Sequence, residues 1–511
     1  MTTDDNMTTT HGSGMTTHTP IEQHLAASGA HKRPLSRRER THARAVAAVF
    51  AGRASGALVR RLRIGGGTSL PGLIAQYADP RLISHLGAQL HHGSVVITGT
   101  NGKTTTSGLT AYVLRETGLR IWRNREGSNL ARGVATALLM RARPNGRLRE
   151  HGDAACVFEV DEAAFPRVVA ELQPRAIVVT NLFRDQLDRY GEVDTVAEKW
   201  RTTLRRLPDT TTLILNADDP AVAALADSHQ GPTVFFGVEQ APSAGERSRD
   251  SDVVDTRTCA RCRAPLTFSR RFYSHIGHWA CPNCGYARPT PTIAAKTVLA
   301  AGLEEARFVL ATPAGEREER VGLPGLYNVY NALAAAAVGT VMGADLAAVS
   351  TGLGRFTPAF GRAERIEAEG RTVHLLLAKN PTGLNEVMRA LAANTTAGPQ
   401  RHLLMLLNDR AADGEDVSWI WDADFEQIAG TTKHLTAGGM RAYDLALRLK
   451  YAGAVPDSVE PEIATALTQA IQATPVGETL FVIPTYTAML AVRGELERRG
   501  FAPHYWEQED V

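Results

Sequence analysis

The sequence predicts an α/β fold with two domains, the larger of which carries a small cysteine-rich insertion. Three observations support this prediction. Apolar strand-like runs alternate with amphipathic helical segments, two Cys-x-x-Cys pairs lie close together in mid-chain, and a connector containing Gly and Pro divides the alternating pattern. Such alternation is typical of a mostly parallel sheet covered by helices. With 511 residues, the chain is long enough for each domain to bury its own core.

The composition excludes several classes of protein. Lysine and arginine number 56 against 54 acidic residues, and the net charge of +2 argues against a general nucleic-acid coat. No apolar run approaches the roughly 18 residues that span a bilayer, and the N-terminus lacks the apolar core of a signal peptide. We therefore expect a cytoplasmic protein.

Residues 1–44 are expected to form a disordered basic tail. They are rich in Thr, Ser, His and Gly without periodicity, and residues 31–40 form a basic run. A helical pattern then runs from Thr41 to about Ile64, where three consecutive glycines end it.

Two groups of strands define the two domains. Each predicted strand is followed by a loop and a helix-like segment, as in doubly wound folds. In the first domain, residues 45–355 with the cysteine insertion at 255–290, we predict strands at 94–98, 155–160, 176–180, 212–216 and 233–236 and a helix at 327–342. In the smaller second domain, residues 356–511, we predict strands at 373–378, 403–408, 434–437 and 480–483.

Residues 94–106 read as a buried strand, a glycine-bearing loop and the first turn of a helix, which is how many proteins bind a nucleoside triphosphate. Backbone N–H groups around Gly99 and Gly102 surround a phosphate, Lys103 reaches the β and γ oxygens, and Thr104 ligates Mg²⁺. The strict P-loop pattern has glycine where this chain has Ile97, so the motif is a variant with a shorter turn; an ordinary strand-to-helix turn is the alternative. The predicted nucleotide contacts here are Gly99, Thr100, Asn101, Gly102, Lys103, Thr104 and Thr105.

Polar side chains follow the other predicted strands at the sheet edge where ligands bind in α/β folds. Glu159 ends one strand, where its carboxylate can hold Mg²⁺ opposite Thr104, unless it is simply a solvated strand-end acid. Asn331 lies too far inside its predicted helix to cap it, unlike Asn328, so we interpret Asn331 as a ligand-binding residue. Further acceptors that suit a ribose or adenine follow the strand at 212–216, and they are Asn216, Asp218 and Asp219.

The cysteine insertion predicts a structural zinc site. Cys259 and Cys262 form one Cys-x-x-Cys pair, Cys281 and Cys284 form another, and eighteen residues separate the pairs. This spacing suits a tetrahedral Zn²⁺ with four thiolates, whereas a redox-active dithiol needs only one pair. The residues between the pairs alternate apolar and polar, as in a β-hairpin. A ribbon of this kind can bind nucleic acid, but it lacks the dense positive charge of that role.

Taken together, these motifs resemble a known family. The loop at 99–105, Glu159, the Thr-Asn stretch at 180–188, the Asn216 to Asp219 stretch and the Tyr-Asn-x-x-Asn helix resemble, in order, the ATP-binding middle domain of Mur ligases. The cysteine insertion, the lack of a preceding UDP-binding domain and the stretch 408–422 narrow the resemblance to the MurT group. The resemblance extends over about residues 45–495.

The resemblance implies an activity, cofactors and a partner. MurT-like proteins are the synthetase half of a lipid II isoglutaminyl synthase, which uses ATP and Mg²⁺ to amidate the α-carboxyl of D-glutamate in the lipid II stem peptide. In that family the carboxylate is phosphorylated, and ammonia from a GatD-type glutaminase then displaces phosphate from the acyl phosphate. A heterodimer with this partner is implied, and membrane contact is implied only through the lipid substrate at the inner face.

The resemblance also assigns roles to residues. Lys103 and Thr104 carry over as phosphate and Mg²⁺ ligands, and Glu159 carries over as a Mg²⁺ ligand. Asp416 matches the aspartate proposed to complete the partner's Cys–His pair, with Asp413 as its close competitor. The resemblance also implies nucleotide contacts by Asn331 with Asp218 or Asp219. Lys379 and Asn380 are expected to face the site from the second domain, and Trp419 and Trp421 suit interface anchors.

Two departures from the family pattern leave a second metal site open. Gln186 stands where amino-acid-adding Mur ligases often have a metal-binding histidine, and Lys199 aligns with the lysine that those ligases carbamylate. Two other functions stay open at this point. One is a stand-alone amino-acid-adding ligase of the Mur or folylpolyglutamate type, and the other is a zinc-ribbon P-loop ATPase that acts on nucleic acid.

Overall fold

The fold is described from a computed structural model, which covers residues 37–61, 69–124, 128–149, 153–184, 193–242, 255–357, 362–393 and 401–503. Residues 1–36 of the predicted tail lie outside this part. The expected N-terminal helix is α1 (Arg37–Arg61), which begins inside the predicted tail, so the last residues of that tail are helical rather than disordered. Both sheets belong to one compact unit, Arg44–Val511.

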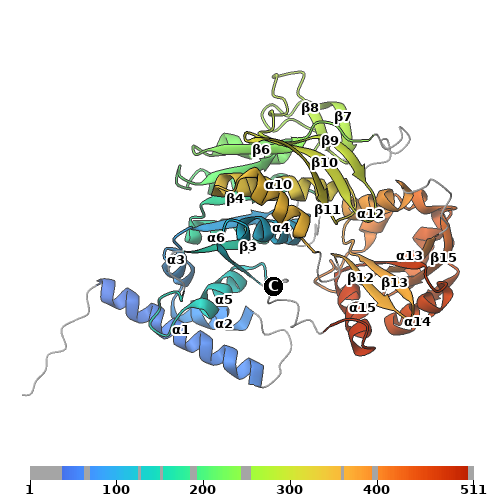
Figure 1. Cartoon of the computed structure of the whole chain (residues 1–511), viewed down its shortest axis with the longest axis horizontal. Helices are drawn as coiled ribbons and strands as arrows, with labels where there is room; N and C mark the ends of the chain where they lie inside the picture. Colours follow the sequence, from blue (N-terminus) through green and yellow to red (C-terminus); the bar gives the residue numbers. More distant parts are fainter. Residues whose placement is uncertain are drawn as a thin grey trace, which may run out of the picture. The chain divides into compact units, whose positions relative to one another are not determined.

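The first domain is built on a nine-stranded sheet with the order β11-β10-β9-β6-β5-β4-β1-β3-β2 (Figure 1). The strands from β9 to β2 in this order run parallel, and β10 and β11 add an antiparallel edge. The strands are β1 (Ser94–Thr98), β2 (Arg120–Arg123), β3 (Ala154–Glu159), β4 (Ala176–Val179), β5 (Thr212–Asn216), β6 (Thr233–Val238), β9 (Ile293–Ala301), β10 (Ala306–Thr312) and β11 (Gly315–Val321).

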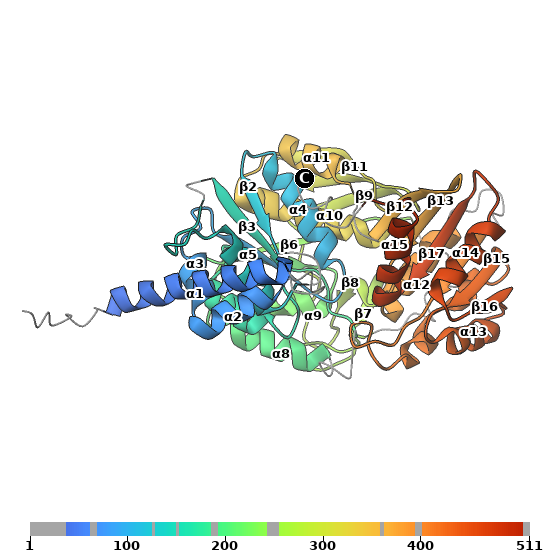
Figure 2. The same cartoon turned by 90° about the horizontal axis from the view of Figure 1, so that it is seen from below.

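Helices cover both faces of this sheet (Figures 1 and 2), which explains why its central strands are apolar throughout. In β1, Val95 and Ile97 pack in the core with α4 and α10, whereas Val96 packs in the opposite core with α5 and α6. The helices are α2 (Leu70–Ala78), α3 (Leu82–Gly87), α4 (Lys103–Arg115), α5 (Ala131–Arg141), α6 (Phe165–Leu172), α8 (Val193–Leu204), α9 (Pro220–Ala223), α10 (Leu326–Met342) and α11 (Leu346–Arg355).

The cysteine insertion contains the predicted hairpin. Strands β7 (Thr267–Tyr273) and β8 (Ile276–Ala280) pair antiparallel as a separate two-stranded sheet, and they lie between β6 and β9 in the sequence. The tip of the hairpin is buried although most of β7 is not, because Tyr273 and Ile276 pack into the core of the large sheet. The tip of the insertion is therefore anchored in the core of the first domain.

The second domain has a six-stranded sheet with the order β12-β13-β17-β14-β15-β16, parallel except for the β12–β13 hairpin. Its helices pack on both faces, as expected for a doubly wound domain. The elements are β12 (Arg362–Ala368), β13 (Arg371–Leu376), α12 (Pro381–Ala393), β14 (Arg401–Leu406), η4 (Ser418–Asp422), η5 (Phe425–Ile428), β15 (Thr432–Gly438), α13 (Ala442–Tyr451), β16 (Ser458–Glu460), α14 (Ile463–Ala473), β17 (Thr479–Pro484) and α15 (Tyr486–Arg498).

Helices α4 and α11 approach so closely that only glycine fits at one position. A Cβ atom on Gly352 would lie 2.5 Å from the Cα atom of Val113, whereas a Cβ atom on Gly354 would meet nothing within 4 Å. Both glycines lie in α11.

We expect Gly352→Ala to lower the free energy of unfolding by about 1–3 kcal/mol, because α11 must move away from α4. Gly354→Ala is the matched control in the same helix, and it should raise stability by about 0.5–1 kcal/mol through higher helix propensity. Urea unfolding of the two variants measures both values. Equal stabilities would show that the helix contact tolerates a methyl group.

Candidate functional site

The loop between β1 and α4 has the backbone shape that the phosphate-binding motif requires. Gly99 and Gly102 have φ values of +129° and +84°, which disfavour any residue with a Cβ atom. Space restricts these positions as well, because a Cβ on Gly99 would lie 2.3 Å from Thr180 Oγ1 and one on Gly102 would lie 2.1 Å from Asn331 Oδ1. The loop is therefore confined to a narrow path.

The segment after β4 holds this loop in place. The amide of Thr100 donates to the Asn181 carbonyl at 3.1 Å, and the amide of Asn101 donates to Asn181 Oδ1 at 2.8 Å. The Thr180 hydroxyl donates to the Asn101 carbonyl at 2.8 Å. The Thr-Asn stretch at 180–188 thus contributes the side chains that fix the phosphate loop, and Asp185, Gln186 and Asp188 of that stretch lie outside the described residues.

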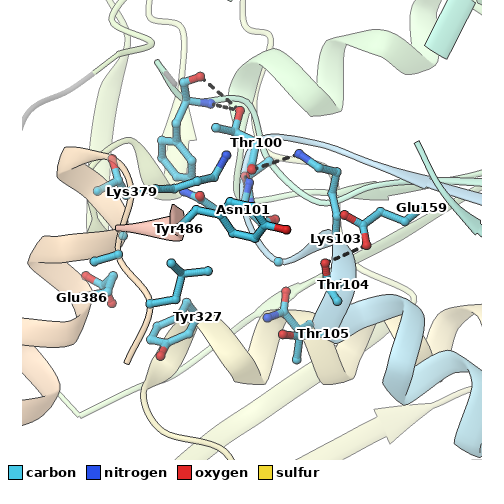
Figure 3. Close-up of a pocket in the computed structure, with 18 of the residues that line it drawn as sticks. Thr100, Asn101, Lys103, Thr104, Thr105, Glu159, Tyr327, Lys379, Glu386 and Tyr486 are labelled. Atoms are coloured by element: carbon cyan, nitrogen blue, oxygen red, sulfur yellow. Dashed lines mark hydrogen bonds between the residues drawn. The ribbon is translucent and has the colours of Figure 1, made fainter. Parts of the chain in front are cut away.

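Lys103, the first residue of α4, is bound to its own loop and to an acid. Its Nζ atom lies 2.5 Å from the Gly99 carbonyl oxygen and 3.0 Å from Glu162 Oε1, and the residue is buried (Figure 3). A bound phosphate would compete with these partners for the ammonium group. Glu162 was not assigned by sequence reasoning, although it lies three positions beyond Glu159 on the same strand end.

Thr104 and Glu159 meet as predicted. The Thr104 hydroxyl donates to Glu159 Oε2 at 2.6 Å, because β3 is the parallel neighbour of β1 and Glu159 is in register with Ile97. Asn124 fixes the Glu159 backbone through bonds of 2.9 Å to its amide and its carbonyl. A hydroxyl and a carboxylate in contact are hard oxygen donors, and this donor set fits Mg²⁺.

These groups line a cavity of about 490 Å³ that extends to the second domain (Figure 3). Asn380, at the start of α12, donates through Nδ2 to Asn101 Oδ1 at 2.9 Å and so joins the second domain to the phosphate loop. Of the predicted residues, the cavity lining includes Thr100, Asn101, Gly102, Lys103, Thr104, Thr105, Glu159, Asn331 and Lys379. Asn181, Phe183 and Tyr327, which belong to the quoted motifs, also line the cavity, and lining residues that sequence reasoning missed include Asp161, Glu162, Glu386 and Tyr486.

Asn331 lies at the cavity wall on α10. Its Oδ1 accepts from the Thr106 hydroxyl at 3.2 Å, and its Nδ2 donates to Asn328 Oδ1 at 2.9 Å. Asn328 in turn donates to the Pro324 carbonyl at 2.7 Å. The two asparagines therefore stand next to each other on one face, as the spacing predicted.

The structure places Asn216, Asp218 and Asp219, which were predicted as nucleotide contacts, outside the cavity lining. All three are fully buried with protein partners. Asn216 donates to the Thr180 carbonyl at 3.0 Å, and Asp219 caps α9. Polar residues after a strand serve here to join neighbouring segments of backbone, so we assign these side chains to the scaffold behind the site.

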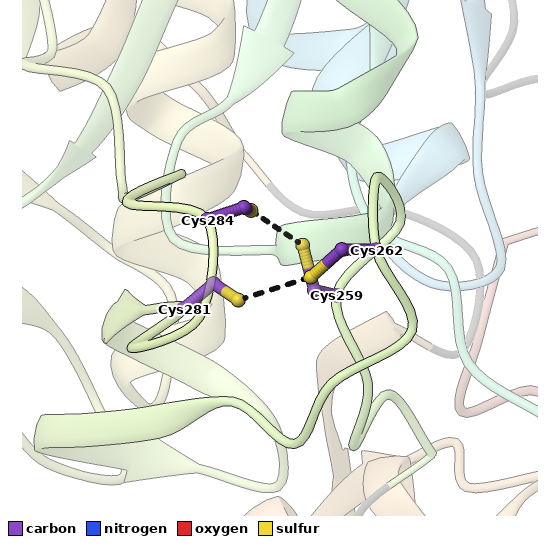
Figure 4. Close-up of side chains that lie close together, drawn as sticks. All are labelled: Cys259, Cys262, Cys281 and Cys284. Atoms are coloured by element: carbon purple, nitrogen blue, oxygen red, sulfur yellow. Dashed lines mark hydrogen bonds between the residues drawn. The ribbon is translucent and has the colours of Figure 1, made fainter.

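The four clustered cysteines converge at one point (Figure 4). Their Sγ atoms all lie within 4.8 Å of one another, with Cys259 and Cys284 at 3.6 Å and Cys262 and Cys281 at 3.4 Å. Four thiolates around a tetrahedral Zn²⁺ at about 2.3 Å would stand about 3.8 Å apart, so the cluster fits the metal with small adjustments. The fifth cysteine, Cys156, is buried in β3, and burial raises the pKa of its thiol above the ordinary range.

The structure separates the two candidate interface aspartates. Asp413 is buried, and it accepts from the Thr487 amide at 2.7 Å and the Thr487 hydroxyl at 2.5 Å. Asp416 is exposed, and the Ser418 amide lowers the pKa of its carboxyl below the usual value. Only Asp416 of the two is accessible to another molecule.

Comparison with known proteins identifies the family. The family models for the Mur ligase middle domain and the MurT ligase C-terminal domain match residues 97–262 and 377–489. The MurT subunit of lipid II isoglutaminyl synthase (glutamine-hydrolyzing) from Streptococcus pneumoniae is 32% identical over 88% of this chain and 96% of its own length. The corresponding subunit from Staphylococcus aureus is 34% identical over 84% and 93%. The chain belongs to the MurT family.

Solved structures confirm the Mur ligase fold for this MurT chain. A pseudomurein peptide ligase type C from Methanothermus fervidus has a TM-score of 0.60 at 22% identity and covers 80% of this chain and 78% of its own. MurF from Acinetobacter baumannii has a TM-score of 0.58 at 18% identity, with coverage of 82% and 80%. Among the described helices of the MurT chain, none combines the length and the hydropathy of a membrane span.

Lys199 stands apart from the other groups that the Mur pattern draws to the site. It is exposed on α8 and does not line the cavity. In this MurT chain the acids that line the cavity near Lys103 are instead Glu159, Asp161 and Glu162, all at the end of β3.

We expect Gly102→Ala to abolish high-affinity ATP binding, because the new methyl group collides with Asn331 and displaces the loop. The left-handed backbone alone costs about 1–2 kcal/mol of stability when a Cβ is added. Gly118→Ala is the matched control, since Gly118 has a similar φ of +82° and open space around it. It should lose the same stability and keep the affinity of the parent for ATP. Titration calorimetry with MgATP compares them, and equal affinities for ATP would contradict the assignment of the loop.

Proposed function

We propose that this MurT-family chain converts D-glutamate in the lipid II stem peptide to D-isoglutamine, with ATP and with ammonia from a GatD-type glutaminase. The γ-phosphoryl group of ATP passes to an oxygen of the α-carboxylate, which gives an acyl phosphate and ADP. Ammonia attacks the acyl carbon, phosphate leaves with the C–O bond electrons, and the added nitrogen loses a proton to form the amide. The observation that carries this proposal is the match to MurT subunits along almost the whole of both chains.

The phosphate loop supplies most of the electrostatic stabilisation. Backbone amides at the N-terminus of α4 point toward a bound phosphate, and Lys103 exchanges Glu162 for phosphoryl oxygens. Thr104 and Glu159 would hold Mg²⁺, which neutralises charge on the triphosphate when it is bound. These groups would offset the negative charge while the phosphoryl group passes from ATP to the carboxylate. Phosphorylation is needed because a free carboxylate is too poor an electrophile for ammonia.

The second domain completes the cavity from the opposite side. Lys379 follows β13, and its positive charge suits the carboxylate of the peptide substrate. The pair formed by Asn101 and Asn380 holds the two domains together beside the phosphate loop. Closure on the nucleotide would exclude water, which otherwise hydrolyses an acyl phosphate.

The cysteine cluster holds a structural zinc ion in this proposal. All four ligand positions are filled by thiolates, so no position is left open for substrate or water. The metal would stabilise an insertion that has only the short β7–β8 hairpin as regular structure.

An apolar surface on the second domain is the proposed docking site for the glutaminase. Tyr443, Leu447 and Tyr451 repeat at helical spacing along α13 and are 70%, 49% and 72% exposed. Trp421, 50% exposed in η4, packs edge-on against Tyr451 with ring centroids 5.6 Å apart. We call these four residues the α13 patch. Asp416 lies two residues before η4 in the chain, and exposed aromatic residues are typical anchors of an interface.

Amidation of lipid II tests the proposed reaction directly. The complex is supplied with ATP, Mg²⁺ and either ammonia or glutamine, and mass spectrometry of the muropeptide detects the acid-to-amide change. Lys103→Ala should abolish turnover with both nitrogen sources, because the ammonium group of Lys103 lies at the phosphate loop, where it would offset the phosphoryl charge. Asp416→Asn should keep the ammonia-dependent rate and lose the glutamine-dependent rate.

Glu415→Gln is the matched control for Asp416, because it is the neighbouring exposed acid. It should keep both rates. Absence of any mass change in the parent complex with either nitrogen source would contradict the proposed function, and an equal loss with both sources in Asp416→Asn would contradict the role of that aspartate only.

The α13 patch generates a separate prediction. Leu447→Glu or Tyr451→Glu should weaken binding of the glutaminase by about 30-fold or more, as hot-spot losses of 2 kcal/mol or more do. Ammonia-dependent amidation should stay at the parent rate. Tyr77→Glu, on the exposed side of α2 in the other domain, is the control. Calorimetric titration measures the affinity, and unchanged affinity in both α13 variants would place the interface elsewhere.

A further inference from the structure

The cysteine insertion contacts the first domain at several points, and one group of these contacts converges on the loop that follows β5. The amide of Gly277 donates to the Asp218 carbonyl at 2.9 Å, and the indole of Trp279 donates to the Ala217 carbonyl at 3.0 Å. Arg288, on the chain that leaves the second Cys-x-x-Cys pair, donates to Asp218 Oδ1 at 2.5 Å. Strand β8 and the segment after the second Cys-x-x-Cys pair therefore meet at the same loop.

Asp218 connects this contact to helix α10. Its Oδ2 accepts from the Tyr330 hydroxyl at 2.6 Å and from the Val238 amide at 2.8 Å. The carboxyl is fully buried, and burial raises its pKa while Arg288 and Tyr330 counteract that rise. Tyr330 lies next to Asn331, which touches the phosphate loop, so the position of α10 at the nucleotide site depends on this carboxylate.

Asp219 connects the same contact to the phosphate loop. Its Oδ2 accepts from the Leu182 amide at 2.9 Å, and Phe183 next to it exchanges hydrogen bonds with the Thr100 hydroxyl. His275, from the turn of the β7–β8 hairpin, is fully buried, with Nε2 3.3 Å from Asp219 Oδ2 and its ring 4.7 Å from the Phe183 ring. The hairpin turn thus packs against Phe183, which in turn is hydrogen-bonded to Thr100.

We propose that the metal-bound cysteine insertion sets the affinity of the ligase site for ATP, with Asp218, Asp219 and Tyr330 as the positioning residues that transmit its placement to the phosphate loop and α10. Asn216, Asp218 and Asp219 then matter to nucleotide binding without contacting the nucleotide. The proposal rests on the proposed nucleotide site, but its readout is ATP binding rather than amidation, so the two can fail separately.

The physical basis is the weak internal structure of the insertion. A lone two-stranded hairpin is marginally stable in water, and Tyr273 is the one fully buried residue of β7. Four metal–thiolate bonds would fix the two Cys-x-x-Cys turns relative to each other and hence Trp279, His275 and Arg288, which follow or lie between them. Loss of the metal would loosen these side chains and release the buried carboxylate of Asp218 from Arg288.

The first experiment removes zinc from the full chain in complex with its partner. Chelation should weaken MgATP binding by about tenfold, within the usual range for coupling between sites, and added Zn²⁺ should restore it. In steady state the KM for ATP should rise while the KM for lipid II stays constant. If zinc had a purely structural role, its removal would lower the fraction of active protein, and therefore the apparent kcat, and leave the affinity for ATP unchanged. That result would overturn the proposal.

The second experiment keeps zinc in place and so does not depend on the chelated protein staying folded. Tyr330→Phe removes only the hydroxyl that binds Asp218, and it should weaken MgATP binding several-fold, whereas Tyr77→Phe on the surface of α2 should not. Because both changes act through one carboxylate, chelation of the Tyr330→Phe variant should weaken ATP binding less than chelation of the parent. Parent-like affinity for ATP in Tyr330→Phe, or strictly independent effects of the two changes, would show that Asp218 does not transmit the influence of the insertion.

Discussion

The constraint on which the site depends is the left-handed backbone at Gly102, packed against Asn331. Here the start of α4 lies against α10, whose packing on α4 the apolar core also secures, and the close contact restricts where the amides at the N-terminus of α4 point. The partners of the loop come from β4, through Thr180 and Asn181, so two neighbouring parallel strands and one distant helix determine a few residues of backbone. A triphosphate site needs such rigidity, because amides that are free to turn outward toward water contribute little to binding.

Much of the fold follows from apolar periodicity and from the ends of strands. Every predicted strand overlaps an observed one, and the helix at 327–342 is observed with one further residue at its start. Three of the strands that sequence reasoning missed lack an apolar run, whereas β9 and β10 were missed although they are largely apolar. Strand β11 carries five consecutive charged residues on an antiparallel edge, β2 carries an arginine at each end, and β16 is only three residues long, so none presents the apolar run that marks a buried parallel strand.

The candidate site was predictable where chemistry is tied to a motif, and less so where it arises from tertiary contact. Thr104 and Glu159 meet because register between parallel strands is regular. Glu386 and Tyr486 reach the cavity from elements more than a hundred residues beyond the phosphate loop, and no local pattern distinguishes them from surface residues. Asp218 and Asp219 looked like ligands because strand-end acids often are, yet full burial gives such acids another role, the joining of neighbouring segments.

The ammonium group of Lys103 has hydrogen-bond acceptors from the protein itself, so the site is stable without a nucleotide. A lysine buried beside the phosphate loop would be costly if it had no acceptors. The carbonyls of Gly99 and Thr100 and the carboxylate of Glu162 provide them, so the cation is retained at the loop rather than expelled to solvent.

Each of these acceptors is weaker as a partner than a triphosphate with several charged oxygens, and the same loop amides then gain partners of their own. At the proposed nucleotide site, ATP would therefore replace one satisfied arrangement by another, and it would release Glu162 at the edge of the cavity that Glu159 and Thr104 also line. That exchange explains why three acids gather at the end of β3 in a site built for anions: without nucleotide they balance the lysine, and with nucleotide their oxygens suit the metal that accompanies it.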